Sequence, residues 1–214
     1  MKATVSAFLL SLAVFFHAGN AIAADSEVVS RFKRALESKD FKTMTILVRK
    51  NLGKIPSEVG SLMDEAFSPN IAPAERDSMF TVAEFMADEY KKQTDDISLL
   101  KGVKVRIFES KLSKPLTPAT QNGVYTVESV STESVKNLFA PGNIIIKKGS
   151  TVRWVNNDTV DHLLASVPVI GSGGIFSPTI EPGASWEYTF NKTGEYYYIC
   201  FIHKVMYGKV TVVD

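Results

Sequence analysis

The strongest constraint on this chain is its last stretch, where a run of aromatic and apolar residues leads into the single cysteine, Cys200. His203 follows three residues later, Met206 three residues after that, and residues 207–213 alternate as a strand does. The pattern predicts a strand, a tight loop and a second strand, with three metal-binding side chains on the loop. A thiolate, an imidazole and a thioether together are ligands that suit copper.

A trigonal copper site of this kind needs a second histidine. The chain has three histidines, and His17 lies in an N-terminal apolar stretch that we expect to be removed. His162, which follows an alternating strand at 151–155 and a turn at 156–158, is therefore the predicted partner of His203. The predicted set is His162, Cys200 and His203, with Met206 as the weak axial ligand.

From about residue 143 to 214 the chain resembles a cupredoxin of the plastocyanin and amicyanin type. The two-residue spacers on both sides of His203 are more similar to amicyanin than to plastocyanin. Two positions differ from the usual pattern: Leu163 stands where family members commonly have Asn, and Lys204 where Pro often follows the second histidine. The matching segments are Ile144–Asn156, Asp161-His162, Gly174–Ser177, Glu181–Gly183, Tyr188–Phe190, Thr193–Tyr197 and the Cys200-x-x-His203-x-x-Met206-x-Gly208 motif.

The resemblance implies a C-terminal antiparallel β-sandwich with Greek-key connections and one copper ion that cycles between Cu(I) and Cu(II). It also implies a type 1, or blue, copper protein that transfers single electrons between protein redox partners. The exposed edge of His203 is then the expected electron port, in a patch with Ile202, Val205 and either Val167 or Val169. Leu163 and Lys204 bear on the reduction potential, because groups around the ligands tune a metal.

Residues 1–23 have the pattern of a secretory signal peptide: Lys2, an apolar core at 8–16, and a small-residue cleavage site near Ala23. We therefore expect export, a periplasmic location and no membrane span after cleavage. The alternative is a retained membrane anchor, which the short apolar core disfavours. In an oxidising compartment an unpaired cysteine forms an intermolecular disulfide, binds a metal, or stays a reactive or a buried inert thiol, and the neighbours of Cys200 favour a metal ligand.

Charge excludes one class of partner. The chain carries 24 Lys and Arg against 23 Asp and Glu, and Lys2 lies in the predicted signal. A nucleic-acid binder usually shows a basic patch or stripe, so we expect no nucleic-acid partner.

The remaining chain predicts an α+β protein of two domains. Apolar residues recur at helical spacing between residues 25 and 101, which predicts a small bundle of about four helices. Residues 103–107 alternate and suggest a short strand. The predicted divisions are a helical domain at 24–108, a linker at 109–122 rich in Ser, Pro and Thr, and a copper-binding domain at 123–214.

The role of the helical domain stays open among docking a redox partner, self-association and attachment of the carrier to a larger complex. Its methionines, Met44, Met63, Met79 and Met86, suggest either a copper-relay surface or ordinary core, and their helical spacing favours core.

Three functions compete for the whole chain. The leading one is an electron carrier, and the second is a protein that stores, delivers or senses copper without electron traffic. The third, a copper enzyme, needs further histidine-rich centres for which this chain has no spare histidine, so we expect no enzymatic activity.

Overall fold

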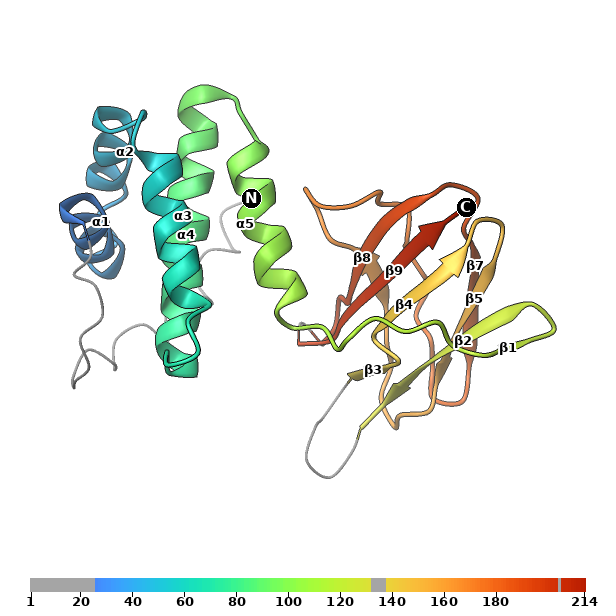
Figure 1. The fold of residues 1–214 in the computed structure, drawn as a ribbon. Coiled ribbons are helices and arrows are strands. Elements are labelled where there is room, and N and C mark those ends of the chain that lie inside the picture. The colour runs from blue at the N-terminus through green and yellow to red at the C-terminus, as the bar shows by residue number, and fades with distance from the viewer. Residues whose placement is uncertain (1–25, 132–137, 204) are drawn as a thin grey trace. The chain divides into compact units, whose positions relative to one another are not determined.

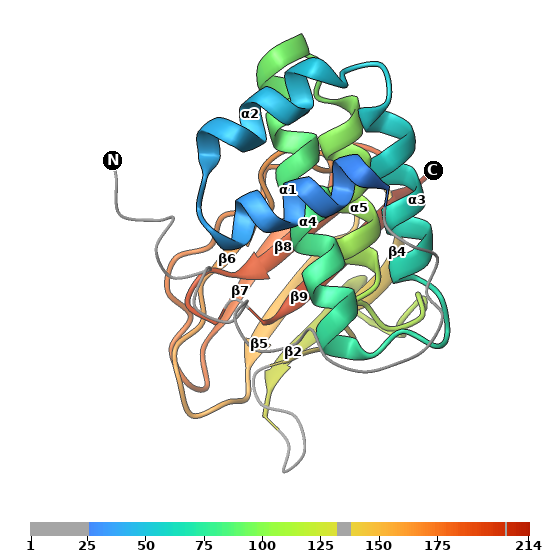
Figure 2. The ribbon, with the colours of Figure 1, turned by 90° about the vertical axis from the view of Figure 1, so that its left-hand side faces the viewer.

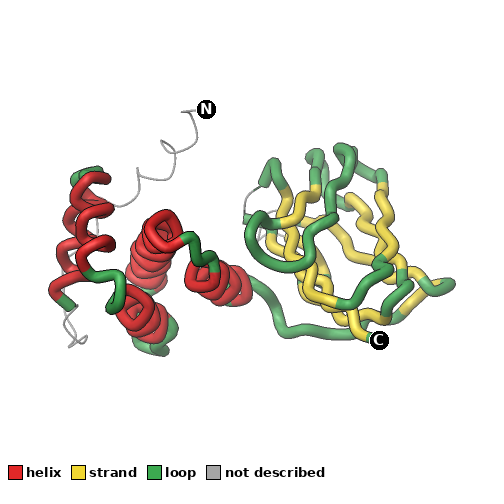
Figure 3. Tube along the Cα trace, turned by 90° about the horizontal axis from the view of Figure 1, so that it is seen from above, coloured by secondary structure: helices red, strands yellow, loops and turns green. Residues whose placement is uncertain are grey.

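A computed structural model describes residues 26–131, 138–203 and 205–214 of the chain. The chain forms two compact units that divide between Lys104 and Val105, the first built of helices and the second mainly of strands (Figure 1, Figure 3). The predicted signal peptide at 1–23, His17 and Lys204 lie outside the described residues. Within the described part, no helix combines the length and the apolar character that crossing a membrane requires.

Helices make up the first unit, and the sequence signals at their ends explain where they begin. The Ser26 side chain accepts a hydrogen bond from the Val29 amide, and the Asp40 carboxylate accepts one from Thr43, so both residues cap helix N-termini. Pro56 and Pro73 lie in the first turns of the next two long helices, where a missing amide hydrogen costs nothing. The helices are α1 (Glu27–Glu37), α2 (Phe41–Lys50), α3 (Ile55–Ala66), α4 (Pro73–Thr94) and α5 (Ser98–Glu109).

The packing of α1 to α4 (Figure 2) buries the apolar stripes that the sequence shows. Met44, Met63, Met79 and Met86 are all buried among these residues. The prediction that they are core is confirmed, and they present no surface for a copper relay.

The prediction of a strand at residues 103–107 is wrong, because this segment belongs to α5. The described residues form five helices, where the sequence predicted about four. Val103, Val105 and Ile107 do alternate with charged residues, but Leu100, Val103 and Phe108 are the buried positions. Their spacing places them on one side of a helix. An apolar run as short as 103–107 is compatible with the period of a strand and with that of a helix.

Two sheets form the second unit. One has the order β1-β2-β5-β7 with β3 on β2, and the other has the order β4-β9-β8-β6. The predicted fold class, a helical part followed by a β domain, is confirmed, but the sheets are mixed: β2 pairs with β5 and β4 with β9 in parallel. The strands are β1 (Thr120–Gln121), β2 (Val124–Val130), β3 (Leu138–Ala140), β4 (Asn143–Lys147), β5 (Thr151–Asn156), β6 (Leu164–Ser166), β7 (Ser185–Thr189), β8 (Gly194–Cys200) and β9 (Tyr207–Val213).

Aromatic residues fill the space between the sheets. Trp154 of β5 and Tyr198 of β8 are fully buried and meet edge to face, with ring centroids 5.5 Å apart. Phe190 packs against both Trp154 and Tyr196. The strands that carry the predicted ligands therefore rest on a dense, rigid core.

The outer side of β8 and β9 is covered by the end of α5. The Phe108 ring meets Tyr197 and Tyr207 edge to face, with centroids 5.2 Å away in each case. Beside it, the Lys209 ammonium lies 2.6 Å from carboxylate oxygens of both Glu109 and Glu195. Burial alone lowers the pKa of Lys209, but its hydrogen bonds to the two carboxylates raise it above its usual range. The last turn of α5 is thus part of the β unit.

The segment after α5 also lies on a sheet. Leu116 forms a parallel bridge with Ile144 and exchanges backbone hydrogen bonds with β4, and the Asn143 side chain donates to the Ser113 carbonyl. Much of what the sequence predicts as a linker is therefore bound along β4. The domain limits at 108 and 122 stay predictions.

Removal of the Phe108 ring should destabilise the β unit specifically. Phe108→Ala deletes the contacts with Tyr197 and Tyr207 and should lower the free energy of unfolding by about 3 to 5 kcal/mol. The chain's two tryptophans, Trp154 and Trp186, both belong to the β unit, so urea unfolding followed by tryptophan fluorescence measures this unit alone. Phe41→Ala, at an exposed position of α2, is the control, and equal effects of the two substitutions would contradict the prediction.

Candidate metal centre

His162 lies between β5 and β6, in a segment held by backbone hydrogen bonds. Its amide donates to the Ile180 carbonyl at 3.1 Å, and its carbonyl accepts from the Ile180 amide at 2.7 Å. The side chain is fully buried. The position of the ring is thus fixed by main-chain bonds on both sides of its own residue.

Cys200, His203 and Met206 lie at the end of β8 and on the loop to β9. The loop is closed by two backbone bonds, from the Met206 amide to the His203 carbonyl at 3.0 Å and from the Cys200 amide to the Met206 carbonyl at 3.2 Å. Cys200 and Met206 are buried, whereas His203 is partly exposed. The strand, loop and strand predicted from the sequence are confirmed.

Gly208 is required where the loop enters β9. It pairs with Tyr198 of β8, and a β-carbon at this position would overlap the Tyr198 ring. The large buried ring and the glycine opposite it therefore form a matched pair that sets how closely β9 passes behind Cys200.

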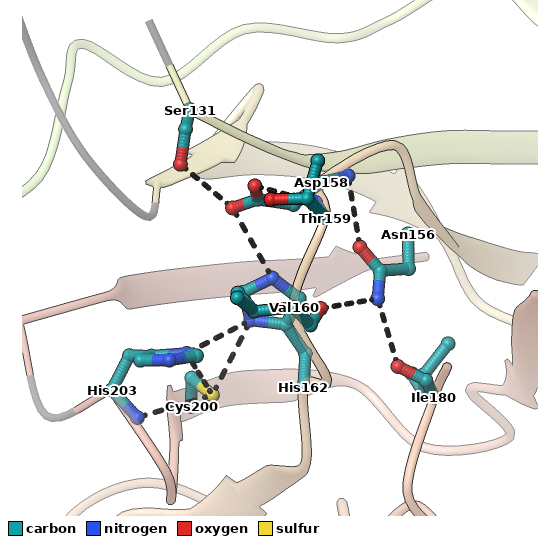
Figure 4. Close-up of polar contacts among 9 residues, drawn as sticks. All are labelled: Ser131, Asn156, Asp158, Thr159, Val160, His162, Ile180, Cys200 and His203. Carbon is teal, nitrogen blue, oxygen red and sulfur yellow. Dashed lines mark hydrogen bonds and ion pairs between the residues drawn. The ribbon is translucent and has the colours of Figure 1, made fainter. Parts of the chain in front are cut away.

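Three of the four predicted ligand residues converge in space (Figure 4). The Cys200 Sγ atom lies 3.6 Å from Nδ1 of His162 and 3.6 Å from Nδ1 of His203, and the two Nδ1 atoms are 3.3 Å apart. The His203 amide also donates a hydrogen bond to the Cys200 Sγ atom at 3.4 Å. His162 and Cys200, separated by 38 positions in sequence, thus meet at one point.

The donor atoms fit a metal ion. A circle through three atoms separated by 3.3, 3.6 and 3.6 Å has a radius of about 2.0 Å, which is the length of a typical bond from a metal to an imidazole nitrogen. Two imidazoles and a cysteine sulfur around one point, with the buried thioether residue Met206 on the same loop, are the donor types of a trigonal copper site.

Two polar residues beside His162, Asn156 and Asp158, were not predicted from the sequence to belong to the site. The buried Asn156 side chain donates to the carbonyls of Val160 and Ile180, both at 2.8 Å, and so holds the segment that precedes the histidine. Oδ2 of Asp158 lies 3.5 Å from Nε2 of His162 (Figure 4). The only sequence signal for these residues was their place in the turn after β5.

The pKa of Asp158 is lowered overall. Burial raises it, but hydrogen bonds from the Ser131 hydroxyl and the Thr159 amide outweigh that effect, and the neighbouring His162 adds to them. Asp158 is therefore ionised at neutral pH beside the buried imidazole.

The tie between the two ligand loops is made by the main chain. The Phe201 amide donates to the Leu163 carbonyl at 2.7 Å, and Leu164 pairs with Cys200 in the β6–β8 ladder. Leu163, which replaces the usual Asn of the resembling family, thus links the His162 segment to the Cys200 loop through its backbone.

Comparison with known proteins agrees with this geometry. Residues 126–213 match the family described as copper binding proteins of the plastocyanin/azurin family. The amicyanin-alpha of Methylorubrum extorquens is 31% identical over 86 residues, which are 39% of this chain and 71% of that protein. The chain belongs to the plastocyanin/azurin family of copper-binding proteins. The family binds one copper ion, so copper is the cofactor of this domain, and His162, Cys200, His203 and Met206 form a potential site for it.

Two further relatives show how much of the chain the likeness covers. The amicyanin of Paracoccus versutus is 34% identical over 78 residues, which are 36% of this chain, and the chain spans 59% of that amicyanin's length. A purple cupredoxin of known structure from Nitrosopumilus maritimus is 30% identical, with 42% of this chain and 99% of that one covered at a TM-score of 0.37. The residues that match the family model, 126–213, lie within the β unit.

The stability of the metal-free protein should depend on pH through His162. Burial lowers the pKa of His162 below its usual 6.5, the charge of His203 lowers it further, and Asp158 opposes both. Because the unfolded chain then binds more protons than the folded one, the free energy of unfolding should fall as the pH drops below about 6.5. Urea unfolding followed by tryptophan fluorescence between about pH 8 and pH 5 measures this slope. His162→Gln should flatten the slope, and an equal slope in both proteins would refute the assignment.

Proposed function

We propose that this protein is an exported electron carrier with a type 1 copper site, in which His162, Cys200 and His203 are the equatorial ligands and Met206 is the axial one. The observation that carries the proposal is the triangle of Sγ and two Nδ1 atoms, with sides of 3.3 to 3.6 Å, at the end of the sandwich. Bound copper would supply the one-electron couple between Cu(I) and Cu(II).

Rigidity supports electron transfer as the use of the site. His162 is held by its bonds to Ile180, and Cys200 by the β6–β8 ladder and the closed loop. A ligand set that keeps one arrangement in both oxidation states avoids a large rearrangement when the charge changes. The coordinating Cys200 would be a thiolate, because a bound metal ion deprotonates a thiol ligand.

Burial favours a carrier over a protein that hands copper on. Cys200, His162 and Met206 are buried, and only His203 of the four is partly exposed. Copper exchange would require opening this loop. An enzymatic copper centre is also disfavoured, since both histidines outside the predicted signal peptide are used at this one site.

An apolar patch beside His203 supports docking to protein redox partners. Phe201, Ile202 and Val205 lie on the same loop as His203, and all three are at least 48% exposed. Phe176, exposed by 72%, bridges Ala165 just beyond His162. Val167, which the sequence offered for this patch, packs instead with Phe108 and Tyr197. An exposed apolar surface around the partly exposed ligand suits brief contact between two redox proteins.

The setting of the carrier is part of the proposal. The predicted signal peptide and the membership of the family support a periplasmic location, with soluble or membrane-bound proteins as electron donor and acceptor. The helical unit is then free to dock one of these partners or a second copy of the chain.

Cys200→Ser should abolish the blue colour. In the copper-loaded protein, the intense visible absorption from thiolate to copper and the corresponding EPR signal should both disappear, because the hydroxyl of serine does not replace a thiolate. Met206→Leu is the matched variant from the same loop, and it should keep the colour while changing the reduction potential. A colourless wild-type protein loaded with copper, or a blue Cys200→Ser protein, would refute the proposal.

A chelator competition on the copper-loaded wild-type protein tests the alternative function, since rapid loss of copper indicates delivery or storage.

Val205→Glu should slow electron exchange without changing the copper site. Two patches that meet would each carry a new charge, and like charges in a contact cost several kcal/mol, so the self-exchange rate should fall by about tenfold or more at low ionic strength. The visible spectrum should stay the same. Val213→Glu, at an exposed position at the far end of β9, is the control, and an equal decrease there would exclude the patch as the contact surface.

A further inference from the structure

The nitrogen of His162 that faces away from the three converging donors is close to a carboxylate. Nδ1 of His162 points at Cys200 and His203, so Nε2 points the other way, toward Oδ2 of Asp158 at 3.5 Å (Figure 4). The exposed fractions of the two side chains are 0% and 6%. Among the described residues, Nε2 makes no hydrogen bond, although it is fully buried, and the Asp158 carboxylate is the charged group that faces it.

Asp158 is held in this place by three hydrogen bonds. Its Oδ2 atom accepts from the Ser131 hydroxyl at 2.7 Å, and its Oδ1 atom accepts from the Thr159 amide at 2.7 Å. Its own amide donates to the side-chain oxygen of Asn156 at 2.9 Å. Both carboxylate oxygens act as acceptors, which is the role of the ionised group. The carboxylate is therefore aimed at His162 from a fixed position.

We propose that Asp158 is a positioning residue for the copper site: it fixes the His162 ring with hydrogen on Nε2 and the lone pair of Nδ1 free for the metal, and its negative charge stabilises Cu(II) over Cu(I). This inference rests on the proposed function above. The physical reason is that a carboxylate on the far nitrogen of a ligating histidine fixes its tautomer and raises its basicity. A nearby buried charge also interacts more strongly with the doubly charged ion than with the singly charged one.

A purely structural role predicts a different outcome. If Asp158 only held the turn together through Ser131 and Thr159, an amide of the same shape would serve nearly as well. If its charge acts on His162, loss of the charge alone changes the metal site. Asp158→Asn separates the two, since it keeps the size of the side chain and an accepting oxygen for the Thr159 amide, and its amide group can still pair with the Ser131 hydroxyl, while the charge is removed.

The main experiment compares the reduction potential and the Cu(II) affinity of the full-length wild-type protein, Asp158→Asn and Asp161→Asn. Removing a partner of a ligating histidine typically weakens metal binding tenfold or more. We expect Asp158→Asn to weaken Cu(II) binding about tenfold and leave Cu(I) binding nearly unchanged, which raises the one-electron potential by about 59 mV. Asp161→Asn removes an equal charge from the residue next to His162, but Asp161 is exposed, so solvent screens it and a much smaller change is expected.

A second measurement needs no copper. In the metal-free protein labelled with ¹⁵N in its histidines, the shifts of His162 report which ring nitrogen carries the hydrogen. We expect hydrogen on Nε2 in the wild type and in Asp161→Asn, and a mixture of both tautomers in Asp158→Leu, where the acceptor is lost. The tautomer of His162 in the wild-type protein can still be measured if Asp158→Asn does not fold.

The outcomes are distinct. A potential for Asp158→Asn no higher than for Asp161→Asn would overturn the proposed effect of charge, and an unchanged tautomer in Asp158→Leu would overturn the proposed orientation of the ring. A wild-type protein that shows no blue band would refute the proposed electron-carrier function instead. The tautomer of His162 in the metal-free protein would still decide whether Asp158 positions the ring.

Discussion

The pairing of β6 with β8 is the constraint on which the site depends. It places Leu164 opposite Cys200, and the bond from the Phe201 amide to the Leu163 carbonyl extends the link into the loop. His162 directly precedes Leu163, the first residue of this linked segment, and its Nδ1 atom therefore lies close to the Cys200 sulfur. The separations of 3.3 to 3.6 Å among the three donors follow from strand register, which main-chain hydrogen bonds fix more firmly than side-chain contacts can.

The two sides of the β8–β9 pair are buried by different means. The inner side rests on Trp154, Phe190 and their aromatic neighbours. The outer side carries Tyr197, and the end of α5 covers it with Phe108 while Glu109 pairs with Lys209. A β-sandwich commonly leaves one sheet face to solvent, whereas here a helix closes that face. The strand that ends in Cys200 is thereby supported on both sides.

The surroundings of His162 combine polar groups with nearly complete burial. Asn156 donates to the Val160 carbonyl of the turn and to the Ile180 carbonyl of the neighbouring segment, and Asp158 adds a negative charge held by Ser131 and Thr159. A buried charge is costly unless hydrogen bonds and an opposite charge compensate it. The bonds from Ser131 and Thr159 supply part of that compensation. A positive ion beyond His162 would supply the rest, so metal binding and the stability of this turn favour each other.

Local patterns in the sequence were sufficient to predict much of this protein. The spacing of Cys200, His203 and Met206 predicted a loop between two strands, and the helical spacing of apolar residues predicted the helices of the first unit, because both signals act over a few residues. The prediction of a strand at 103–107 was wrong because five alternating residues are too short a run to distinguish the period of a strand from that of a helix. The parallel pairs within the sheets, the covering of Tyr197 by Phe108 and the meeting of His162 with Cys200 depend on register and packing between distant segments. Only the tertiary structure decided them, since contacts between segments far apart in the chain leave no periodic signal in either one.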